Sequence, residues 1–404
     1  MTSPASQDRH PAAVFWIFLR LGLTSFGGPI AHLGYFHEMA VSRRKWLSDR
    51  DYADLVALCQ FLPGPASSQV GLSLGLLRAG YSGAIAAWAG FTLPSAAAMM
   101  VVALGFAHFR ELLTAETLQG LKIVAVAVVA QAVWGMARKI CINHQRSMMM
   151  VGAAAFALVF PTSLGQIGLI AASAGAGLIF FSAQSGSPQL PLPIKVSERT
   201  GVAFLLVFLL FLGLLPVLTR VTQVESLAYL DAFYRTGSLV FGGGHVVLPL
   251  LQAEVVNPGW VSRETFLTGY GAAQAVPGPL FSFAAYLGTS LTGTWAGIWL
   301  GLLCLAAIYL PSFLLVFGVI PFWERLRRNQ RMQAMFIGLN VGVVGLLLAA
   351  FIQPVWTSAI HQFSDFVIAA LAFTALTLWK APAWLVVMAT GFTGWLITYL
   401  PGLV

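Results

Sequence analysis

The stretch Leu62-Pro63-Gly64-Pro65 and its counterpart Val276-Pro277-Gly278-Pro279 each interrupt a long apolar run, at about 50–79 and 262–292. Proline lacks a backbone N–H and clashes with the preceding helical turn, so each stretch should end one helix and begin another. The new helix starts with unpaired N–H groups and a partial charge of roughly +0.5. Such a terminus can bind an anion through backbone alone. A simple kink without a ligand is the alternative.

The composition around these breaks is typical of a membrane protein. Of 404 residues, 58% are hydrophobic and 9% are charged, against roughly 25% charged in soluble globular proteins. Apolar runs of about twenty residues favour transmembrane helices over the alternating strands of a membrane β-barrel. We therefore predict an all-α integral membrane protein with about 13 transmembrane helices. The candidate spans lie at about 14–37, 50–79, 83–107, 118–138, 147–160, 164–182, 200–219, 227–252, 262–292, 295–321, 334–353, 363–379 and 383–400.

The two breaks belong to a pattern that occurs twice in the chain. Phe18 to Gly28 matches Phe233 to Gly243, and further positions recur in register: Trp46 and Trp260, Ser48 and Ser262, Gln60 and Gln274, Gly75 and Gly288, Gly80 and Gly293, Pro94-Ser95 and Pro311-Ser312. Self-similarity at a fixed spacing indicates one structural unit used twice. We predict repeat one at 14–182, a linker with one connecting helix at 183–226, and repeat two at 227–404.

The number of spans bears on how the repeats are oriented. Six spans and the connecting one give seven crossings between equivalent points, and an odd number inverts the second repeat, as in many secondary transporters. Thirteen spans with a cytoplasmic N-terminus and an external C-terminus, however, leave Arg43, Arg44, Lys45 and Arg50 outside, against the positive-inside rule. If the Pro-Gly-Pro segments were re-entrant hairpins, the crossings would drop to six and the Arg325–Arg331 cluster would change side. We take thirteen spans as the prediction.

Two arginines occupy matching positions in the apolar runs, Arg20 and Arg235. A guanidinium at mid-bilayer costs about 2.5–3.5 kcal/mol on insertion scales, which favours a role near the substrate path over snorkelling. Arginine forks onto tetrahedral oxygens. Together with two helix termini, the pair sums to about +3, which suits a divalent oxyanion and repels a cation.

Other candidates surround these groups. Gly27-Gly28-Pro29 and Gly242-Gly243-Gly244 should stop a helix within the membrane, where unpaired backbone is tolerated only inside protein or beside water; close helix packing is the alternative. The predicted substrate-binding set is Arg20, Gly27, Gly28, Gln60, Pro63, Gly64, Pro65, Ser67, Arg235, Gly242, Gly243, His245, Gln274, Pro277, Gly278, Pro279 and Ser282. Glu38 and Glu254 are candidates for proton coupling, with a salt bridge at a loop as the alternative.

The sequence offers no pattern of an enzyme. It has no P-loop, no His-Glu-x-x-His and no Gly-x-Ser-x-Gly elbow, so we expect neither catalysis, nor a cofactor, nor a metal. The three cysteines, Cys59, Cys141 and Cys304, lack metal-ligand spacing. The net charge of +8 clusters in short loops between apolar runs, which is typical of membrane topology and not of nucleic-acid binding.

The motifs resemble the chromate ion transporter (CHR) family in its long, two-domain form. The resemblance rests on Phe26 to His32, Arg43 to Trp46, the Leu-Pro-Gly-Pro stretch, Val240 to Leu251 and Gly269 to Gly288. It implies a multi-pass transporter of the bacterial cytoplasmic (inner) membrane that exports chromate, confers chromate resistance and is driven by the proton-motive force, as an antiporter would be. One departure is that Pro29 stands where repeat two has Gly244.

The partners expected are therefore chromate, or sulfate as a dianion of the same shape, and the lipid bilayer; a homodimer is allowed but not required. An inside-negative potential drives a dianion outward, which makes export the easier direction. Two readings stay open beside the exporter: a passive anion channel, and an importer of sulfate or molybdate.

Overall fold

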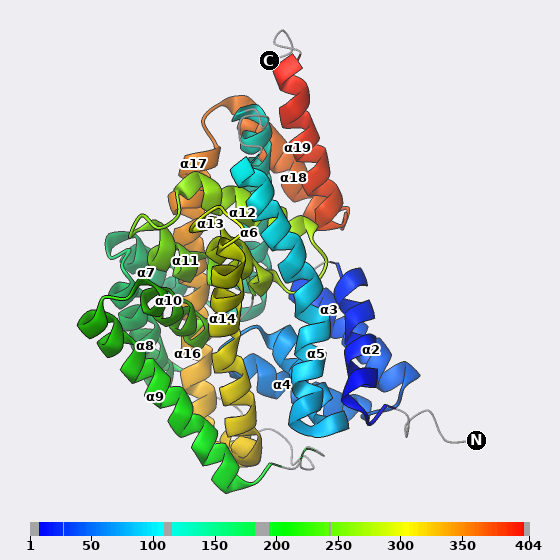
Figure 1. Ribbon diagram of the computed structural model, residues 1–404. Helices are drawn as coiled ribbons and strands as arrows, with labels where there is room; N and C mark the ends of the chain where they lie inside the picture. The colour runs from blue at the N-terminus through cyan, green and yellow to red at the C-terminus, as the bar shows by residue number, and fades with distance from the viewer. Residues whose placement is uncertain are drawn as a thin grey trace.

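The computed structural model describes residues 8–26, 28–108, 115–181, 194, 196–241 and 244–399. Its regular elements are all helical in this part of the chain (Figure 1). Five of the helices are long and apolar enough to cross a membrane: Ala66–Phe106, Lys122–Ile140, Glu198–Thr222, Gly297–Arg328 and Gln330–Ala359. The prediction of an all-α, multi-pass membrane protein is thus confirmed.

The helices follow the two predicted repeats. Repeat one contains α2 (Pro11–Thr24), α3 (Gly28–His37), the π-helix η1 (Glu38–Arg43), α4 (Asp49–Phe61), α5 (Ala66–His108), α6 (Ala115–Ile140), α7 (His144–Val159) and α8 (Ser163–Phe180). The helix α9 (Glu198–Thr222) connects the repeats. Repeat two contains α10 (Glu225–Leu239), η2 (Gly244–Val246), α11 (Val247–Leu251), the π-helix η3 (Gln252–Val256), α12 (Arg263–Ala275), η4 (Leu280–Ser282), α13 (Phe283–Ser290), α14 (Gly297–Val319), η5 (Ile320–Phe322), α15 (Trp323–Arg328), α16 (Gln330–Ala350), η6 (Phe351–Trp356), α17 (Thr357–Ala359), α18 (Phe363–Thr377) and α19 (Ala383–Tyr399).

Each repeat begins with a helical hairpin, which we call hairpin one. In repeat one, Asp8 precedes α2, and its carboxylate accepts hydrogen bonds from Arg44, at 2.6 and 2.7 Å, and from Trp46 Nε1, at 3.1 Å, just after η1. In repeat two, the rings of Tyr229 and Trp260 meet edge to face at 4.8 Å. The outer ends of both arms therefore lie together, and the chain turns back at the glycine motif.

A second hairpin, hairpin two, follows in each repeat and turns at Pro-Gly-Pro. In repeat one it consists of α4 and the first part of α5, because Arg78 lies 5.1 Å over the ring of Trp46, just before α4 begins. In repeat two it consists of α12 and α13, because the Tyr286 hydroxyl donates to the Thr265 carbonyl at 3.0 Å. The structure thus favours the re-entrant alternative over one broken span.

The chain then reverses tightly after each hairpin two. Gly80 (φ +66°) breaks α5 in repeat one, and Gly293 (φ +63°) lies between α13 and α14 in repeat two. The flanking helices touch closely: a Cβ on Gly75 would strike the Gly83 carbonyl, and one on Gly288 would lie 2.8 Å from Gly301 Cα. The recurring glycines therefore form the same turn twice.

The hairpins of the two repeats approach from opposite ends of α14. The Asp54 carboxylate of α4 pairs with Arg327 at 2.6 Å, beyond one end of α14. Gly297, at the other end, packs against Thr289 of α13. Since 23 helical residues extend about 34 Å, the hairpins enter from opposite sides and meet with their tips near the middle.

The lengths of the hairpin arms bear on the count of thirteen spans. α2, α3, α4 and α12 have 14, 10, 13 and 13 residues, and at 1.5 Å per residue each is shorter than the ~30 Å hydrocarbon layer. These arms do not cross a bilayer alone, so the structure does not supply thirteen full spans.

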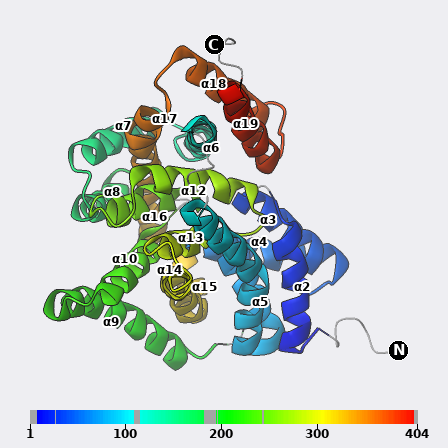
Figure 2. The ribbon, with the colours of Figure 1, turned by 45° about the horizontal axis from the view of Figure 1, so that its top comes forward.

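The later helices are exchanged between the repeats. α7 and α8 of repeat one pack on α16 of repeat two, while α18 and α19 of repeat two pack on α6 of repeat one (Figure 2). Small residues allow both contacts: a Cβ on Gly177 would lie 2.9 Å from Gly338 Cα, and one on Gly120 would lie 3.3 Å from Gly391 Cα. The exchange ties the repeats into one body.

Candidate functional site

The hairpin tips meet through two reciprocal backbone hydrogen bonds. The Gly64 N–H donates to the Val240 carbonyl at 2.6 Å, and the Gly278 N–H donates to the Ser25 carbonyl at 3.0 Å. Ser25 and Val240 cap the C-termini of α2 and α10 and hold matching positions in the repeats. Reciprocal contacts of this kind require a two-fold relation between the partners. We call the region around these four residues the tip crossing.

Glycine is needed at both Pro-Gly-Pro centres for two reasons. Gly64 has φ +124° and Gly278 has φ +104°, values that L side chains rarely adopt. The tips also lie close to the opposite repeat, since a Cβ on Gly64 would lie 2.5 Å from Ser312 Oγ and one on Gly278 would lie 2.9 Å from Ser95 Oγ. The matching serines of the two Pro-Ser pairs thus face the matching glycines of the other repeat.

Helix N-termini begin at the tip crossing, as the Pro-Gly-Pro stretches predict. α4 ends at Phe61 and α5 begins at Ala66, while α12 ends at Ala275 and η4 begins at Leu280. Within the described residues, the N–H groups of Ala66 and Ser67 have no acceptor. Free N–H groups and the positive end of a helix dipole favour an anion.

The tip crossing is lined by neutral polar groups. Four buried polar atoms there have no hydrogen-bond partner among the described residues: Ser25 Oγ, Gln69 Oε1, Thr92 Oγ1 and Gln274 Nε2. Gln69 Nε2 donates to the Pro63 carbonyl at 2.6 Å, and Ser68 Oγ lies 3.5 Å from the Tyr309 hydroxyl. Buried polar atoms are normally paired, so unused hydrogen-bonding capacity is gathered where the repeats meet.

The predicted set falls into three groups. Pro63, Gly64, Pro65 and Ser67 lie at the tip crossing together with Pro277, Gly278, Pro279 and Ser282. Gly28 begins α3 with φ +75°, Gln60 is exposed on α4, and His245 Nδ1 lies 2.8 Å from the Tyr270 hydroxyl. Gly27, Gly242 and Gly243 lie outside the described residues.

The two matching arginines differ in their partners. Arg20 is exposed and forms no ion pair with any described residue. Arg235 pairs at 2.9 Å with Asp231 and at 2.9 Å with Glu254. Since two carboxylates accompany Arg235, the expected sum of about +3 does not describe the charge in this arrangement.

The other candidate for proton coupling is a surface group. The Glu38 carboxylate accepts a hydrogen bond from Arg43 Nε at 3.0 Å, and both side chains are more than half exposed. This hydrogen bond lowers the pKa of Glu38 below its usual value. Glu38 and Glu254 therefore lie in different surroundings, although both belong to π-helices at matching places.

The sequence analysis missed several groups at and near the tip crossing. Gln69 lies at the site, His32 Nε2 lies 3.2 Å from the Ser25 carbonyl, and Asp231 pairs with Arg235. The i,i+4 spacing of Asp231 and Arg235 is a signal that could have identified the pair. No comparable pattern points to His32, because its counterpart in repeat two is Val247.

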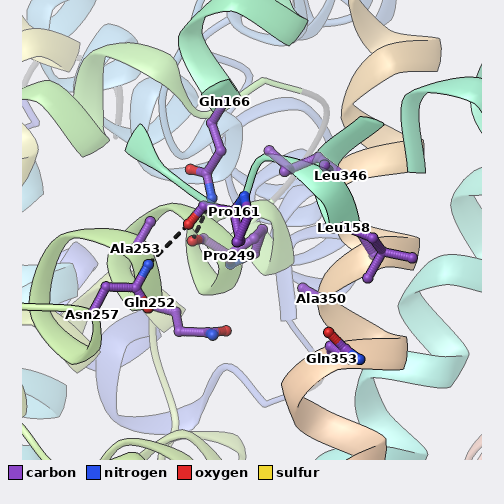
Figure 3. A pocket seen from close by; sticks show the side chains of 12 residues that line it. Leu158, Pro161, Gln166, Pro249, Gln252, Ala253, Asn257, Leu346, Ala350 and Gln353 are labelled. Carbon is purple, nitrogen blue, oxygen red and sulfur yellow. Dashed lines mark hydrogen bonds between the residues drawn. The ribbon is translucent and has the colours of Figure 1, made fainter. Parts of the chain in front are cut away.

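A separate pocket, with about 390 Å³ of empty volume, lies where α7 and α8 of repeat one meet α11, η3 and α16 of repeat two (Figure 3). Amides from Gln166, Gln252, Asn257 and Gln353 line it among apolar side chains, with no charged residue. Gln166 Nε2 already donates to the Pro249 carbonyl, and Asn257 Nδ2 to the Pro161 carbonyl. Because these donors are used, the tip crossing is the better anion site. The described residues contain no group of side chains that could hold a metal ion.

Comparison with known proteins agrees with the architecture. The profile of the chromate transporter family matches residues 12–178 and 227–395. An uncharacterised transporter of Methanocaldococcus jannaschii is 28% identical over 85% of this chain and 85% of its own length. A probable chromate transport protein of Synechococcus elongatus is 27% identical over 90% and 88%, and a chromate transport protein of Pseudomonas aeruginosa is 25% identical over 95% and 92%. No solved structure matches. The chain therefore belongs to the chromate transporter family.

Proposed function

We propose that this protein is a secondary active transporter that exports chromate, a divalent tetrahedral oxyanion, from the bacterial cytoplasm and thereby confers chromate resistance. The observation that carries the proposal is the tip crossing, where half-helix N-termini and unpaired buried polar atoms of both repeats come together. Relatives named for chromate transport support the choice of substrate.

The chemistry of the tip crossing suits an oxyanion without a charged ligand. The free N–H groups of Ala66 and Ser67 and the hydroxyls of Ser25 and Thr92 are hydrogen-bond donors. Helix dipoles add partial positive charge, and broken helices that point their N-termini at an anion recur in transporters. Sulfate has the same charge and shape, so it is the natural competitor.

The hairpins also remove the conflict in the charge distribution. Contacts of Asp8 and Trp46 keep Arg43, Arg44, Lys45 and Arg50 near the outer ends of the repeat-one hairpins, and the Asp54–Arg327 pair brings Arg325–Arg331 to the same end. Since cytoplasmic loops carry the excess of lysine and arginine, we assign this end to the cytoplasm. The cytoplasmic membrane of a bacterium is the membrane we propose.

The same hairpins support inverted repeats. Between matching points of the two repeats the chain passes through five helices: the second part of α5, then α6, α7, α8 and α9. If each crosses the bilayer, the number is odd and the second repeat is inverted. The approach of the hairpins from opposite ends of α14 agrees with this orientation.

The membrane potential alone can drive export. Moving two negative charges outward gains about 4.6 kcal/mol per 100 mV, which supports a gradient of somewhat over a thousandfold. Uptake of the same ion would need about three protons to become electrically favourable. The direction that we propose therefore needs no chemical energy source.

The test is efflux of labelled chromate from liposomes that contain the purified protein and hold an inside-negative potential. We expect saturable, potential-driven efflux that sulfate inhibits. Efflux no faster than from protein-free liposomes would overturn the proposal. Single-channel currents and flux that does not saturate would show a channel instead, and a transport rate highest for inward sulfate would show an importer.

A further inference from the structure

The strongest difference between the repeats lies at their matching arginines. Arg235 is 23% exposed and is held by two carboxylates that are more buried still, Asp231 at 8% and Glu254 at 11%, each at 2.9 Å. Arg20 is exposed and has no ion pair with the described residues. Equivalent arginines thus face opposite electrostatic conditions in one molecule.

The sequence explains this difference. The position of Asp231 corresponds in repeat one to Trp16, which cannot pair with Arg20 and is 62% exposed. Glu38, the nearest acid of repeat one in the register of Glu254, is drawn to Arg43. We call Asp231, Arg235 and Glu254 the arginine triad. Within the described residues it has no equivalent in repeat one.

The arginine triad lies inside hairpin one of repeat two and joins its two arms. Asp231 and Arg235 belong to α10, and Glu254 belongs to the π-helix η3 on the returning arm. Arg235 precedes Val240, which accepts the hydrogen bond from Gly64, by five residues, or about 7.5 Å along the helix. π-Helical turns occur frequently at functional sites.

Few other ionisable groups accompany the arginine triad. α9 contributes Arg220, which acts electrostatically on Asp231. α10 itself contributes Glu225, Tyr229 and Tyr234, α14 contributes Cys304 and Tyr309, and α11 and η3 add none besides Glu254. The Tyr234 hydroxyl is engaged with the Phe208 carbonyl. The balance of charge around Arg235 is therefore set mainly by the two carboxylates.

The fully ionised arginine triad carries a net charge of −1. A dianion at the tip crossing is repelled by it, and the low dielectric of a protein interior increases the repulsion. One proton on either carboxylate removes the net charge and weakens one of the two ties on Arg235. The guanidinium has a donor to spare, because Arg235 Nε is buried and has no acceptor among the described residues.

We infer that the arginine triad is a proton-binding switch which makes anion binding tighter when it is protonated, because protonation releases Arg235 toward the tip crossing. The inference rests on the proposed function, since it needs an anion at the tip crossing. Linkage is reciprocal: a bound anion also draws a proton onto the triad. Proton and anion then move in the same direction, the opposite of an antiporter, and one net negative charge still leaves the cell for each dianion that is exported.

The test measures equilibrium binding of labelled chromate to the purified protein at pH 7.5 and above, where chromate is a dianion. Glu254→Gln and Asp231→Asn imitate the protonated triad, so each should bind chromate about fivefold more tightly or better. A pH-sensitive dye in weak buffer should report proton uptake when chromate is added to the wild type, and less uptake in either variant. Glu198→Gln, which breaks the exposed pair with Arg325, is the matched control and should leave both readouts unchanged.

The outcomes separate the two proposals. Unchanged or weaker chromate binding in both folded variants, or no proton uptake by the wild type, would overturn the switch and leave the exporter intact. A wild type that binds no chromate would overturn the proposed function itself. If the single variants fail to fold, proton uptake by the wild type still decides the matter.

Discussion

The Gly64 N–H donates to the Val240 carbonyl, and through this bond the Pro-Gly-Pro tip of repeat one ends against the first helix of repeat two. The matching bond from Gly278 to Ser25 completes the pair. Because both bonds join backbone atoms at helix ends, they hold the N-termini that we assign to the anion in a fixed relation. Any movement of one hairpin tip therefore moves a tip of the other repeat.

Gly64→Ala and Gly278→Ala should each reduce chromate efflux by tenfold or more. Their positive φ values cost of order 1–3 kcal/mol for other residues, and an added Cβ would strike Ser312 Oγ or Ser95 Oγ. Efflux from liposomes is the measurement. Gly152→Ala is the matched control because a Cβ there meets open space; equal efflux in all three variants would contradict the role of the tip crossing.

The two arginines should respond differently to substitution. Arg235→Gln leaves two buried carboxylates without their cation and should lower the free energy of unfolding by about 3–5 kcal/mol, whereas Arg20→Gln should leave thermal stability within about 0.5 kcal/mol. Thermal melting in detergent measures both. Adding Asp231→Asn and Glu254→Gln to Arg235→Gln should restore most of the stability, and failure of this rescue would show that the arginine stabilises by packing.

Arg20→Gln tests transport as well. If Arg20 attracts the anion, the variant should need several-fold more chromate for half-maximal efflux, with little change in the amount of folded protein. Efflux measured over a range of chromate concentrations gives this value. An unchanged concentration dependence would remove Arg20 from the mechanism and leave it as an arginine that snorkels to the interface.

The Asp54–Arg327 pair should be a structural lock between the repeats. Its side chains are 7% and 12% exposed, and Trp323 Nε1 also donates to Asp54 at 3.2 Å. Asp54→Asn should therefore lower the free energy of unfolding by about 3 kcal/mol or more. Thermal melting gives the value, with Glu38→Gln, at an exposed pair, expected to change it by under about 1 kcal/mol. Equal losses in the two variants would show that burial of the Asp54 pair is unimportant.

The hairpins predict which residues share a side of the membrane. In a variant without Cys59, Cys141 and Cys304, cysteines placed at Arg50 and Arg331 should both react from the cytoplasmic side with a membrane-impermeant thiol reagent. A cysteine at Arg263, at the outer end of the repeat-two hairpins, should react from the opposite side. Labelling of Arg50 and Arg331 from different sides would favour thirteen spans with one broken span at each Pro-Gly-Pro.

Much of the fold could be predicted because glycine and proline mark backbone turns directly. Gly80 and Gly293 were matched from spacing alone, and both occupy the same positive-φ turn. The hairpins could not be predicted, since apolar runs such as 14–37 are long enough for a span and the contact of Asp8 with Arg44 joins residues 36 positions apart. For the site, matching positions located the tips, but matching residues need not have matching partners, as Arg20 and Arg235 show.

The exchange of contacts between the repeats has a consequence for how such a protein could be divided. A chain with only one repeat would present a glycine N–H at one tip and a helix-capping carbonyl at the other, each without its complement. Two copies could satisfy both only by inserting into the membrane in opposite orientations. Joining the repeats in one polypeptide through α9 guarantees that every molecule contains one of each orientation, whatever the rate at which single copies would insert either way.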